Sequence, residues 1–329
     1  MIPYIHIPDG QIGPLPIHWL GIDKHALPLH PFGILVATGV LIGTAITTRR
    51  ARSFGWDVVK LNSFLTWMLV SAFVLSHVLD SLFYHWDEVV RRPWSVLMLW
   101  EGLSSFGGFI GALVGIVLWR YFVIEDGRLQ ARKTPHPLLP FADLVLSVLP
   151  VGWMFGRMGC ASVHDHPGAI ASPDSLFAVE APAHWGQTSF TAIDGEVTKV
   201  WFIEFLHGHY PRYDLGLLEL MFTVLLTTCF AITWLRRPPL GSYVVATALS
   251  YAPVRFIMDY LRVGATEGGD ARYAGLTPAQ YCCVALFVFG IAMIVHMRRI
   301  KAKGLDLAAS VREPPPPPPQ ADTPADAPA

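Results

Sequence analysis

Long apolar stretches, separated by shorter polar ones, occupy most of the chain. Seven of them are long enough to cross about 30 Å of hydrocarbon as helices. They are residues 31–48, 60–83, 102–123, 138–156, 215–235, 241–262 and 276–297. The fourth stretch is the weakest, because it is short and carries Asp143. The pattern predicts an all-α polytopic membrane protein with about seven transmembrane helices.

Composition supports the same interpretation. The chain is 53% hydrophobic and 15% charged, whereas average soluble domains carry about 25% charged residues. Its net charge of −1 indicates no particular partner, and no nucleic-acid partner is predicted. Residues 1–30 lack a basic start followed by an apolar run. We therefore expect no cleavable signal peptide, and the first span itself directs membrane insertion.

Basic residues decide the predicted orientation, because cytoplasmic loops are enriched in Lys and Arg. With seven spans, four basic clusters fall on one side of the membrane. The clusters are Arg49, Arg50 and Arg52; Arg128, Arg132 and Lys133; Arg236 and Arg237; and Arg298, Arg299, Lys301 and Lys303. The N-terminus is therefore predicted to lie outside and the C-terminus in the cytoplasm.

This topology divides the chain into three parts. Residues 1–30 form an outer N-terminal segment, and residues 31–297 form the transmembrane domain. Within the latter, the outer loop at about 157–214 includes alternating stretches such as EVTKVWFIEF, which predict a small strand-containing cap. Residues 298–329 are predicted to be a basic, Pro-rich cytoplasmic tail without fixed structure, because its six consecutive prolines cannot pack into a core.

Three charged residues, Arg255, Asp259 and Arg262, interrupt the sixth apolar stretch. At 3.6 residues per turn they fall on one helical face. A charge at bilayer depth costs roughly 2.5–3.5 kcal/mol on insertion scales and commonly marks a functional site. The alternative is structural: Arg255 and Asp259 form an ion pair while Arg262 extends to the interface.

Arg157 lies between two glycines in GRMGCASVHDHPG (156–168), which follows the fourth predicted span. A guanidinium group suits a phosphate, because its planar donors match two oxygens at once. An interfacial anchor is an equally good explanation of Arg157. An aromatic and charged belt at the membrane interface is predicted just before the fifth span. It consists of Tyr210, Arg212, Tyr213 and Asp214.

Glycines and histidines suggest two further sites. Gly111 and Gly115 have the spacing of close helix packing, whereas the adjacent Gly107 and Gly108 could leave room for a lipid chain. Histidines are dense in the long outer loop, and with Asp165 they could bind a divalent ion. They are His164, His166, His184, His207 and His209. Histidine-rich loops commonly cap polar surfaces instead, and neither a metal nor a cofactor is predicted.

Taken in order, several segments resemble the prolipoprotein diacylglyceryl transferase family. They are HPFGILVATGVLIG, SHVLDSLFYHWDEV, WEGLSSFGGFIG, GRMGC with HDHPG, YPRYDLGLLE, YAPVRFIMDYLR and GLTPAQ. Arg157, Asp165 and Gly168 match the arginine, acid and closing glycine of the family signature. Arg255, Asp259 and Arg262 match the Arg, Glu and Arg of its late span.

The resemblance implies an enzyme of the bacterial inner membrane. Such enzymes transfer the diacylglyceryl group of phosphatidylglycerol to the lipobox cysteine thiol in the signal peptide of a prolipoprotein, forming a thioether and releasing glycerol phosphate. It assigns catalytic roles to Arg157, Arg255 and Asp259. It also assigns substrate binding to a larger set: Arg157, Gly107, Gly108, Cys160, Asp165, Gly168 and Arg262.

The chain departs from the family pattern at several positions. Phe106 stands where a histidine is common, and Cys160 stands where the family has asparagine. The segment containing Pro211, Asp214 and Glu219 keeps its pattern only loosely. These departures leave an alternative function open, namely a catalytically altered paralogue that binds anionic phospholipid without transferring it.

Overall fold

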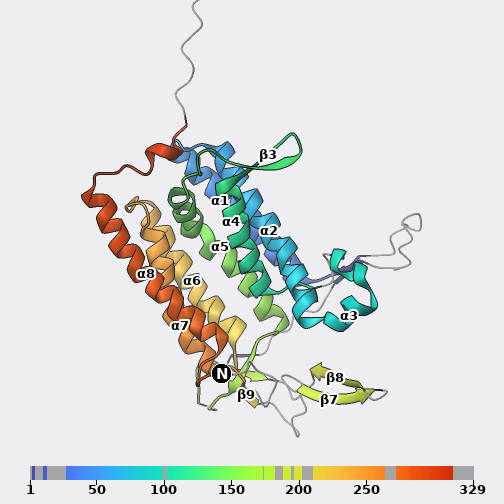
Figure 1. Ribbon diagram of the computed structural model, residues 1–329. Coiled ribbons are helices and arrows are strands. Elements are labelled where there is room, and N and C mark those ends of the chain that lie inside the picture. Colours follow the sequence, from blue (N-terminus) through green and yellow to red (C-terminus); the bar gives the residue numbers. More distant parts are fainter. Residues whose placement is uncertain are drawn as a thin grey trace, which may run out of the picture. The chain divides into compact units, whose positions relative to one another are not determined.

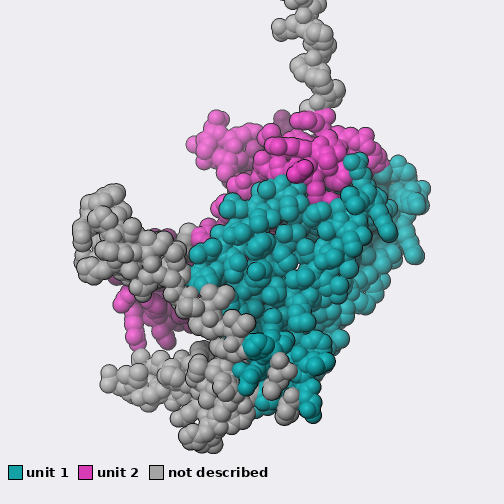
Figure 2. Space-filling model, turned by 180° about the vertical axis from the view of Figure 1, so that it is seen from behind, with its two compact units in different colours: residues 1–47, 139–305 teal, residues 48–138, 306–329 magenta. Residues whose placement is uncertain are grey.

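The computed structural model is predominantly helical. It describes residues 2–3, 10–12, 27–98, 102–172, 174–181, 188–193, 196–201, 210–263 and 272–313. These residues divide into two compact units, residues 1–47 with 139–305 and residues 48–138 with 306–329 (Figure 2). Five helices are long and apolar enough to cross a membrane, judged by length and composition. They are α1 (Pro31–Ser53), α2 (Val58–Tyr84), α5 (Leu139–Val163), α6 (Leu215–Trp234) and α8 (Pro278–Ala302).

Two shorter helices complete the predicted set of seven. They are α4 (Ser105–Tyr121) and α7 (Ser242–Met258), of 17 residues each. Every predicted apolar stretch thus contains a helix of at least 17 residues, which confirms the all-α polytopic membrane fold class. One boundary was wrong: α5 continues through Gly156–Val163, so Arg157 and Cys160 lie on a helix and not in a loop after it.

In the first unit, α5 packs against α6 and α7, and α7 packs against α8 (Figure 1). Phe230 and Tyr243 stack edge to face in its core, with ring centroids 5.1 Å apart. The carboxylate of Asp143 in α5 accepts hydrogen bonds from the backbone N–H groups of Tyr243 and Val244, at 2.8 and 3.0 Å. Because the N-terminal amides of a helix lack intrahelical acceptors, Asp143 caps α7 from a neighbouring helix.

The same unit contains the strands of the predicted cap. A three-stranded sheet has the order β5–β9–β6, and β7 pairs with β8 as a hairpin. The strands are β5 (Pro167–Ile170), β6 (Ala178–Ala181), β7 (Thr188–Ile193), β8 (Glu196–Trp201) and β9 (Tyr210–Asp214). A two-stranded pair, β1 (Gly10–Ile12) with β2 (Leu27–Leu29), precedes α1. Since α5 extends to Val163, the strands begin after it, at Pro167.

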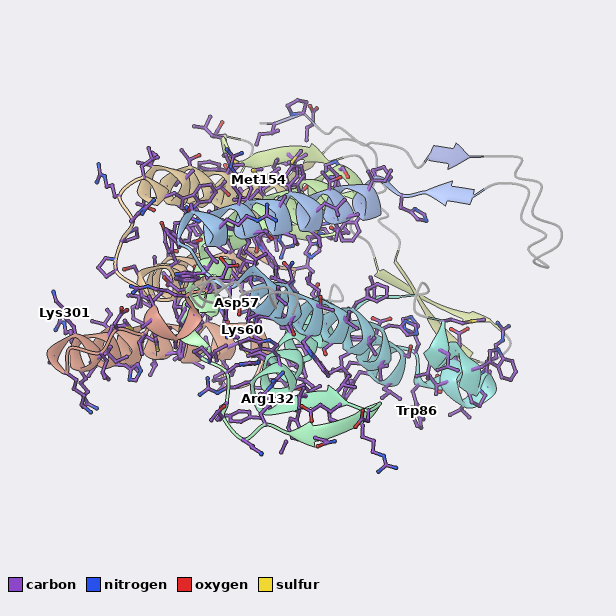
Figure 3. The ribbon with its side chains drawn as sticks, turned by 90° about the horizontal axis from the view of Figure 1, so that it is seen from above. Asp57, Lys60, Trp86, Arg132, Met154 and Lys301 are labelled. Carbon is purple, nitrogen blue, oxygen red and sulfur yellow. The ribbon has the colours of Figure 1, made fainter. Side chains whose placement is uncertain are left out.

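In the second unit, α2 and α4 lie side by side (Figure 1). Glycines make this close approach possible: a Cβ on Gly111 would lie 2.3 Å from the carbonyl oxygen of Ser71, and one on Gly115 equally close to that of Trp67. The predicted packing role of Gly111 and Gly115 is therefore confirmed. Asp57 begins α2, where its side chain accepts from the backbone N–H of Lys60 at 2.9 Å (Figure 3).

Smaller elements complete this unit. They are α3 (Trp86–Arg91), the 3₁₀ turn η2 (Pro93–Leu97) and the hairpin β3 (Phe122–Glu125) with β4 (Arg128–Ala131). Part of the predicted tail is ordered: residues 298–302 belong to α8, and Val311 is buried. The N–H of Asp57 donates to the carbonyl of Val311 at 2.8 Å, so residues up to 313 have a fixed structure. The proline run lies outside the described residues.

Candidate functional site

Arg157 and Glu219 form a buried ion pair between α5 and α6. Their Nη2 and Oε2 atoms are 3.1 Å apart, and 14% of the arginine side chain remains exposed. The other carboxylate oxygen accepts from Trp153 Nε1 at 3.0 Å and from the Tyr251 hydroxyl at 2.9 Å. Arg157 also lies over the Trp153 ring, 5.1 Å from its centroid. Three helices thus hold one carboxylate and, through it, fix one guanidinium group.

Asp259 connects the two arginines of the sixth stretch, Arg255 and Arg262. Its Oδ1 lies 3.3 Å from Arg255 Nη1 and 3.3 Å from Arg262 Nε, and its side chain is fully buried. The Thr277 hydroxyl donates to its second oxygen. Helix α7 ends at Met258, and the 3₁₀ turn η3 (Asp259–Leu261) follows it. Arg255, Asp259 and Arg262 therefore do not lie on one continuous α-helix, as the predicted common face assumed. The three side chains nevertheless converge.

Helix α7 connects the Arg157–Glu219 pair with the group formed by Arg255, Asp259 and Arg262. Tyr251, which donates to Glu219, lies one helical turn before Arg255, and its hydroxyl interacts electrostatically with both Arg157 and Arg255. Together the ion pairs of the two groups join three guanidinium groups and two carboxylates. Arg157 and Arg255 keep 14% and 15% of their side chains exposed. Such an arrangement suits a bound anion, because guanidinium donors match phosphate oxygens.

Cys160 and Asp165 lie beside Arg157. Cys160 is buried in the last turn of α5, and Arg157 Nη1 donates to its Sγ at 3.5 Å. Asp165 is exposed and accepts from His166 Nδ1 at 2.5 Å. The ligand atoms of Cys160, Asp165 and His166 lie within 4.8 Å of one another, which makes these three the residues that could hold a metal ion in the described part of the chain.

Gly168 is enclosed by backbone. A Cβ there would meet the carbonyl oxygens of Leu261 and Tyr213 at 2.8 Å each. Gly168 forms an isolated antiparallel bridge with Arg262, and its carbonyl accepts from Arg212 Nε at 2.6 Å. Gly168 therefore links the strand after α5 to the chain that carries Arg262, and a larger residue would separate them.

The predicted interfacial belt was wrong for its two charged members. Arg212 and Asp214 are fully buried. Asp214 accepts from His164 Nδ1 at 2.6 Å and from the N–H of Leu217 at 3.1 Å, which caps the start of α6. His164 is thus engaged with Asp214, and of the two predicted histidines that the structure describes, His166 joins the possible metal ligands. His184, His207 and His209 lie outside the described residues.

Gly107 and Gly108 belong to the second unit, at the start of α4. A Cβ on Gly107 would lie 2.8 Å from the carbonyl oxygen of Leu75, so this glycine continues the packing face of Gly111. On Gly108 a Cβ would make ordinary van der Waals contact with Ser76, whose Oγ would lie 3.8 Å away. Their assignment to substrate binding stays a prediction.

Sequence reasoning missed the residues that hold Arg157. Glu219 entered only as part of a loosely matching segment, and Trp153 and Tyr251 were not singled out. The available signal was Glu219 itself, a carboxylate within the apolar run LGLLELMF. An ionisable group in a membrane span normally faces a partner or a cavity. Pairing it with Arg157 would have been the natural hypothesis.

Most of the chain is similar to known proteins. A family model described as prolipoprotein diacylglyceryl transferase matches residues 11–296. A protein from Azoarcus sp. (strain BH72) is 24% identical over 297 residues, covering 89% of this chain and 95% of the relative. Another, from Shigella boydii serotype 4 (strain Sb227), is 22% identical over 306 residues, covering 90% and 96%. A third, from Pseudomonas entomophila (strain L48), is 24% identical, covering 89% and 95%.

These three relatives are each named phosphatidylglycerol–prolipoprotein diacylglyceryl transferase. The matched region includes every long helix except the last residues of α8, and it contains both arginine groups. Since the family model spans well over half of the chain, the protein belongs to the prolipoprotein diacylglyceryl transferase family.

Proposed function

We propose that this protein transfers the diacylglyceryl group of phosphatidylglycerol to the lipobox cysteine thiol of a prolipoprotein. The observation that carries the proposal is the set of three arginines, Arg157, Arg255 and Arg262, each held by a buried carboxylate among apolar helices. Guanidinium donors match the oxygens of an anionic phosphate headgroup, whereas a lipid without a phosphate offers them no such partner. The names of the relatives point to the same lipid and the same kind of acceptor.

In the reaction, the acceptor sulfur attacks the glycerol carbon that carries the phosphate. A carbon–sulfur bond forms, the carbon–oxygen bond breaks, and its electron pair remains on the phosphate oxygen of the released glycerol phosphate. The thiol proton passes to a base. We assign Arg157 and Arg255 to the phosphate, where their charge stabilises the leaving group. Asp259 and Glu219 position them, because each carboxylate bonds directly to a guanidinium group.

The remaining assignments concern the surroundings of this centre. Arg262, Cys160, Asp165 and Gly168 contribute to the substrate site from positions next to the two arginine groups. We place the protein in the bacterial inner membrane, with the N-terminus outside and the C-terminus in the cytoplasm, following the basic clusters. The polar centre then faces the outer leaflet, where a lipobox cysteine arrives after translocation of its chain.

Membranes containing phosphatidylglycerol and a lipobox peptide provide the test. Arg157→Ala and Arg255→Ala are expected to abolish the mass increase of the peptide, while insertion and expression remain measurable by immunoblot. Arg299→Ala is the matched control, because Arg299 is exposed in the last turn of α8. Full activity in both site variants would refute the proposal.

A lipid-binding paralogue without transferase activity is the second candidate. The feature that favours it is Cys160, whose Sγ contacts Arg157 where the family pattern has an asparagine. Complementation of a strain depleted of its own transferase separates the two functions. Growth on expression of this chain supports the transferase, whereas failure despite normal insertion and phosphatidylglycerol binding supports the paralogue.

A further inference from the structure

A sharp reversal of the chain follows α5 and folds two polar side chains back over its last turn. Cys160 lies in that turn, and the helix ends at Val163. His164 then adopts φ 52°, a left-handed conformation that is uncommon for a residue other than glycine. Asp165 and His166 follow directly. The thiol, carboxylate and imidazole atoms consequently gather within 4.8 Å of one another.

The reversal is held in place by buried contacts. His164 Nδ1 donates to the Asp214 carboxylate at 2.6 Å, and both side chains are buried. Asp214 is itself fixed as the cap of α6, through the N–H of Leu217 at 3.1 Å. The N–H of Leu215 donates to the carbonyl of His166 at 3.0 Å. Two helices thereby fix the backbone that presents Asp165 and His166.

The chemistry of the three groups favours a borderline-soft divalent cation. Zn²⁺ prefers thiolate, imidazole and carboxylate ligands in a tetrahedral arrangement, and Mg²⁺ or Ca²⁺ prefers oxygen alone. Metal–ligand bonds of about 2.0–2.3 Å place tetrahedral ligand atoms roughly 3.3–3.6 Å apart. A spread of up to 4.8 Å therefore requires a contraction of about 1.2–1.5 Å, and the 2.5 Å hydrogen bond between Asp165 and His166 must open. Side-chain rotations of Asp165 and His166 supply both changes, since 40% and 29% of these side chains are exposed.

Arg157 and Glu219 lie next to Cys160. Metal binding displaces the thiol proton of a cysteine ligand, and the metal itself compensates the thiolate charge. Arg157 Nη1 donates to Cys160 Sγ at 3.5 Å, while Glu219 balances the arginine charge at 3.1 Å. Cys160 closes the site on the protein side, and Asp165 and His166 leave it open to solvent. Three protein ligands leave a fourth position for water or an anion.

We infer that Cys160, Asp165 and His166 form a binding site for Zn²⁺ or a similar borderline-soft cation beside Arg157. This site adjoins Arg157, which contacts Cys160, and its occupation needs no lipid. Cys160 and Asp165 are engaged by the metal when it is bound. If the proposed transferase function holds, occupancy therefore competes with substrate binding next to Arg157, and Zn²⁺ inhibits transfer.

Titration of the purified full-length protein with Co²⁺ tests the inference without any activity measurement. Co²⁺ substitutes for Zn²⁺, and a thiolate ligand gives a near-ultraviolet charge-transfer band that histidines outside the site cannot produce. We expect one equivalent to generate the band, Zn²⁺ to displace it, and Cys160→Ser to remove it. Cys283→Ser is the matched control, since Cys283 is also a buried helical cysteine, and it should keep the band.

Two further variants keep the test decisive if Cys160→Ser fails to fold. Loss of outer-shell partners already weakens metal binding by about 10–100-fold, so His166→Ala and Asp165→Asn should each weaken Co²⁺ binding by more than about 100-fold. Both residues are partly exposed, and their replacement leaves the core unchanged. A wild-type protein without the band, or a band that survives Cys160→Ser or both exposed variants, would overturn the inference. Failure of lipid transfer alone would not affect it.

Discussion

Replacement of Glu219 by glutamine tests the arginine centre most directly. Glutamine keeps a carbonyl oxygen that can still accept from Trp153 and Tyr251, at the 3.0 and 2.9 Å positions of the native contacts. It loses the negative charge that lies 3.1 Å from Arg157 and presents an N–H₂ group or a neutral oxygen there. The variant therefore isolates the ion pair from the two neutral hydrogen bonds.

The expected cost follows from burial. Removing one partner of a buried ion pair costs about 3–5 kcal/mol, because the other charge is left without compensation. Arg157 keeps 14% of its side chain exposed, so partial hydration reduces the figure to about 2–4 kcal/mol. Each retained neutral hydrogen bond is worth only about 1 kcal/mol. Loss of the charge should therefore dominate the effect on the free energy of unfolding.

Unfolding in mixed micelles with increasing SDS measures this free energy. Arg157→Met combined with Glu219→Gln removes both charges and should be less destabilised than the sum of the single variants by at least about 2 kcal/mol. Asp306→Asn is the control, because it breaks an exposed ion pair of 3.0 Å with Arg312 and should cost at most about 1 kcal/mol. Additive single effects, or a Glu219→Gln cost equal to that of the control, would refute the reasoning.

Three further predictions use the same unfolding measurement or solution NMR. Gly111→Ala should destabilise by about 1–3 kcal/mol through the clash between α2 and α4, whereas Gly43→Ala, with nothing within 4 Å, should gain about 0.5–1 kcal/mol. Asp143→Ala should cost about 1–3 kcal/mol and speed hydrogen exchange in the first turn of α7. Burial and the charge of Arg132 lower the pKa of His136 to about 4, so its imidazole signals should titrate near that value. Because the pKa of His136 is lower in the folded state than in the unfolded state, its contribution to stability is complete above about pH 6.5 and is lost as the pH falls toward 4. An imidazole of His136 that titrates near pH 6.5 would contradict this prediction.

The helices were predictable because residues that face lipid are apolar, so long apolar stretches mark membrane-spanning helices. The end of α5 was not predictable in this way. Residues 156–163 are rich in glycine and polar groups, yet they continue the helix because their partners are protein atoms: Gly159 packs against Phe32, and Gly216 packs against Cys160. A window of apolar residues identifies the part of a helix that faces lipid, and it misses the part that lines a polar interior.

Asp143 illustrates a second limit. As a charged residue in a short apolar stretch, it made the fourth span look weak. In the structure it stabilises that region, because it caps the amides of Tyr243 and Val244, which lie 100 and 101 residues away in sequence. Arg212 and Asp214 were misplaced for the same reason: the sequence reveals their charge, and only the fold reveals the partners that allow burial.

The competing explanations of the sixth stretch can now be weighed on its contacts. The structural alternative is borne out in part, because Arg255 pairs with Asp259 at 3.3 Å, and Arg262 lies at the same distance from this carboxylate. A single structural ion pair needs one arginine, whereas Asp259 is shared by two. Its carboxylate therefore sets the positions of both guanidinium groups, which keep 15% and 27% of their side chains exposed. Guanidinium donors held in this way match phosphate oxygens, so we expect a phosphate ligand at Arg255 and Arg262 as well as at Arg157.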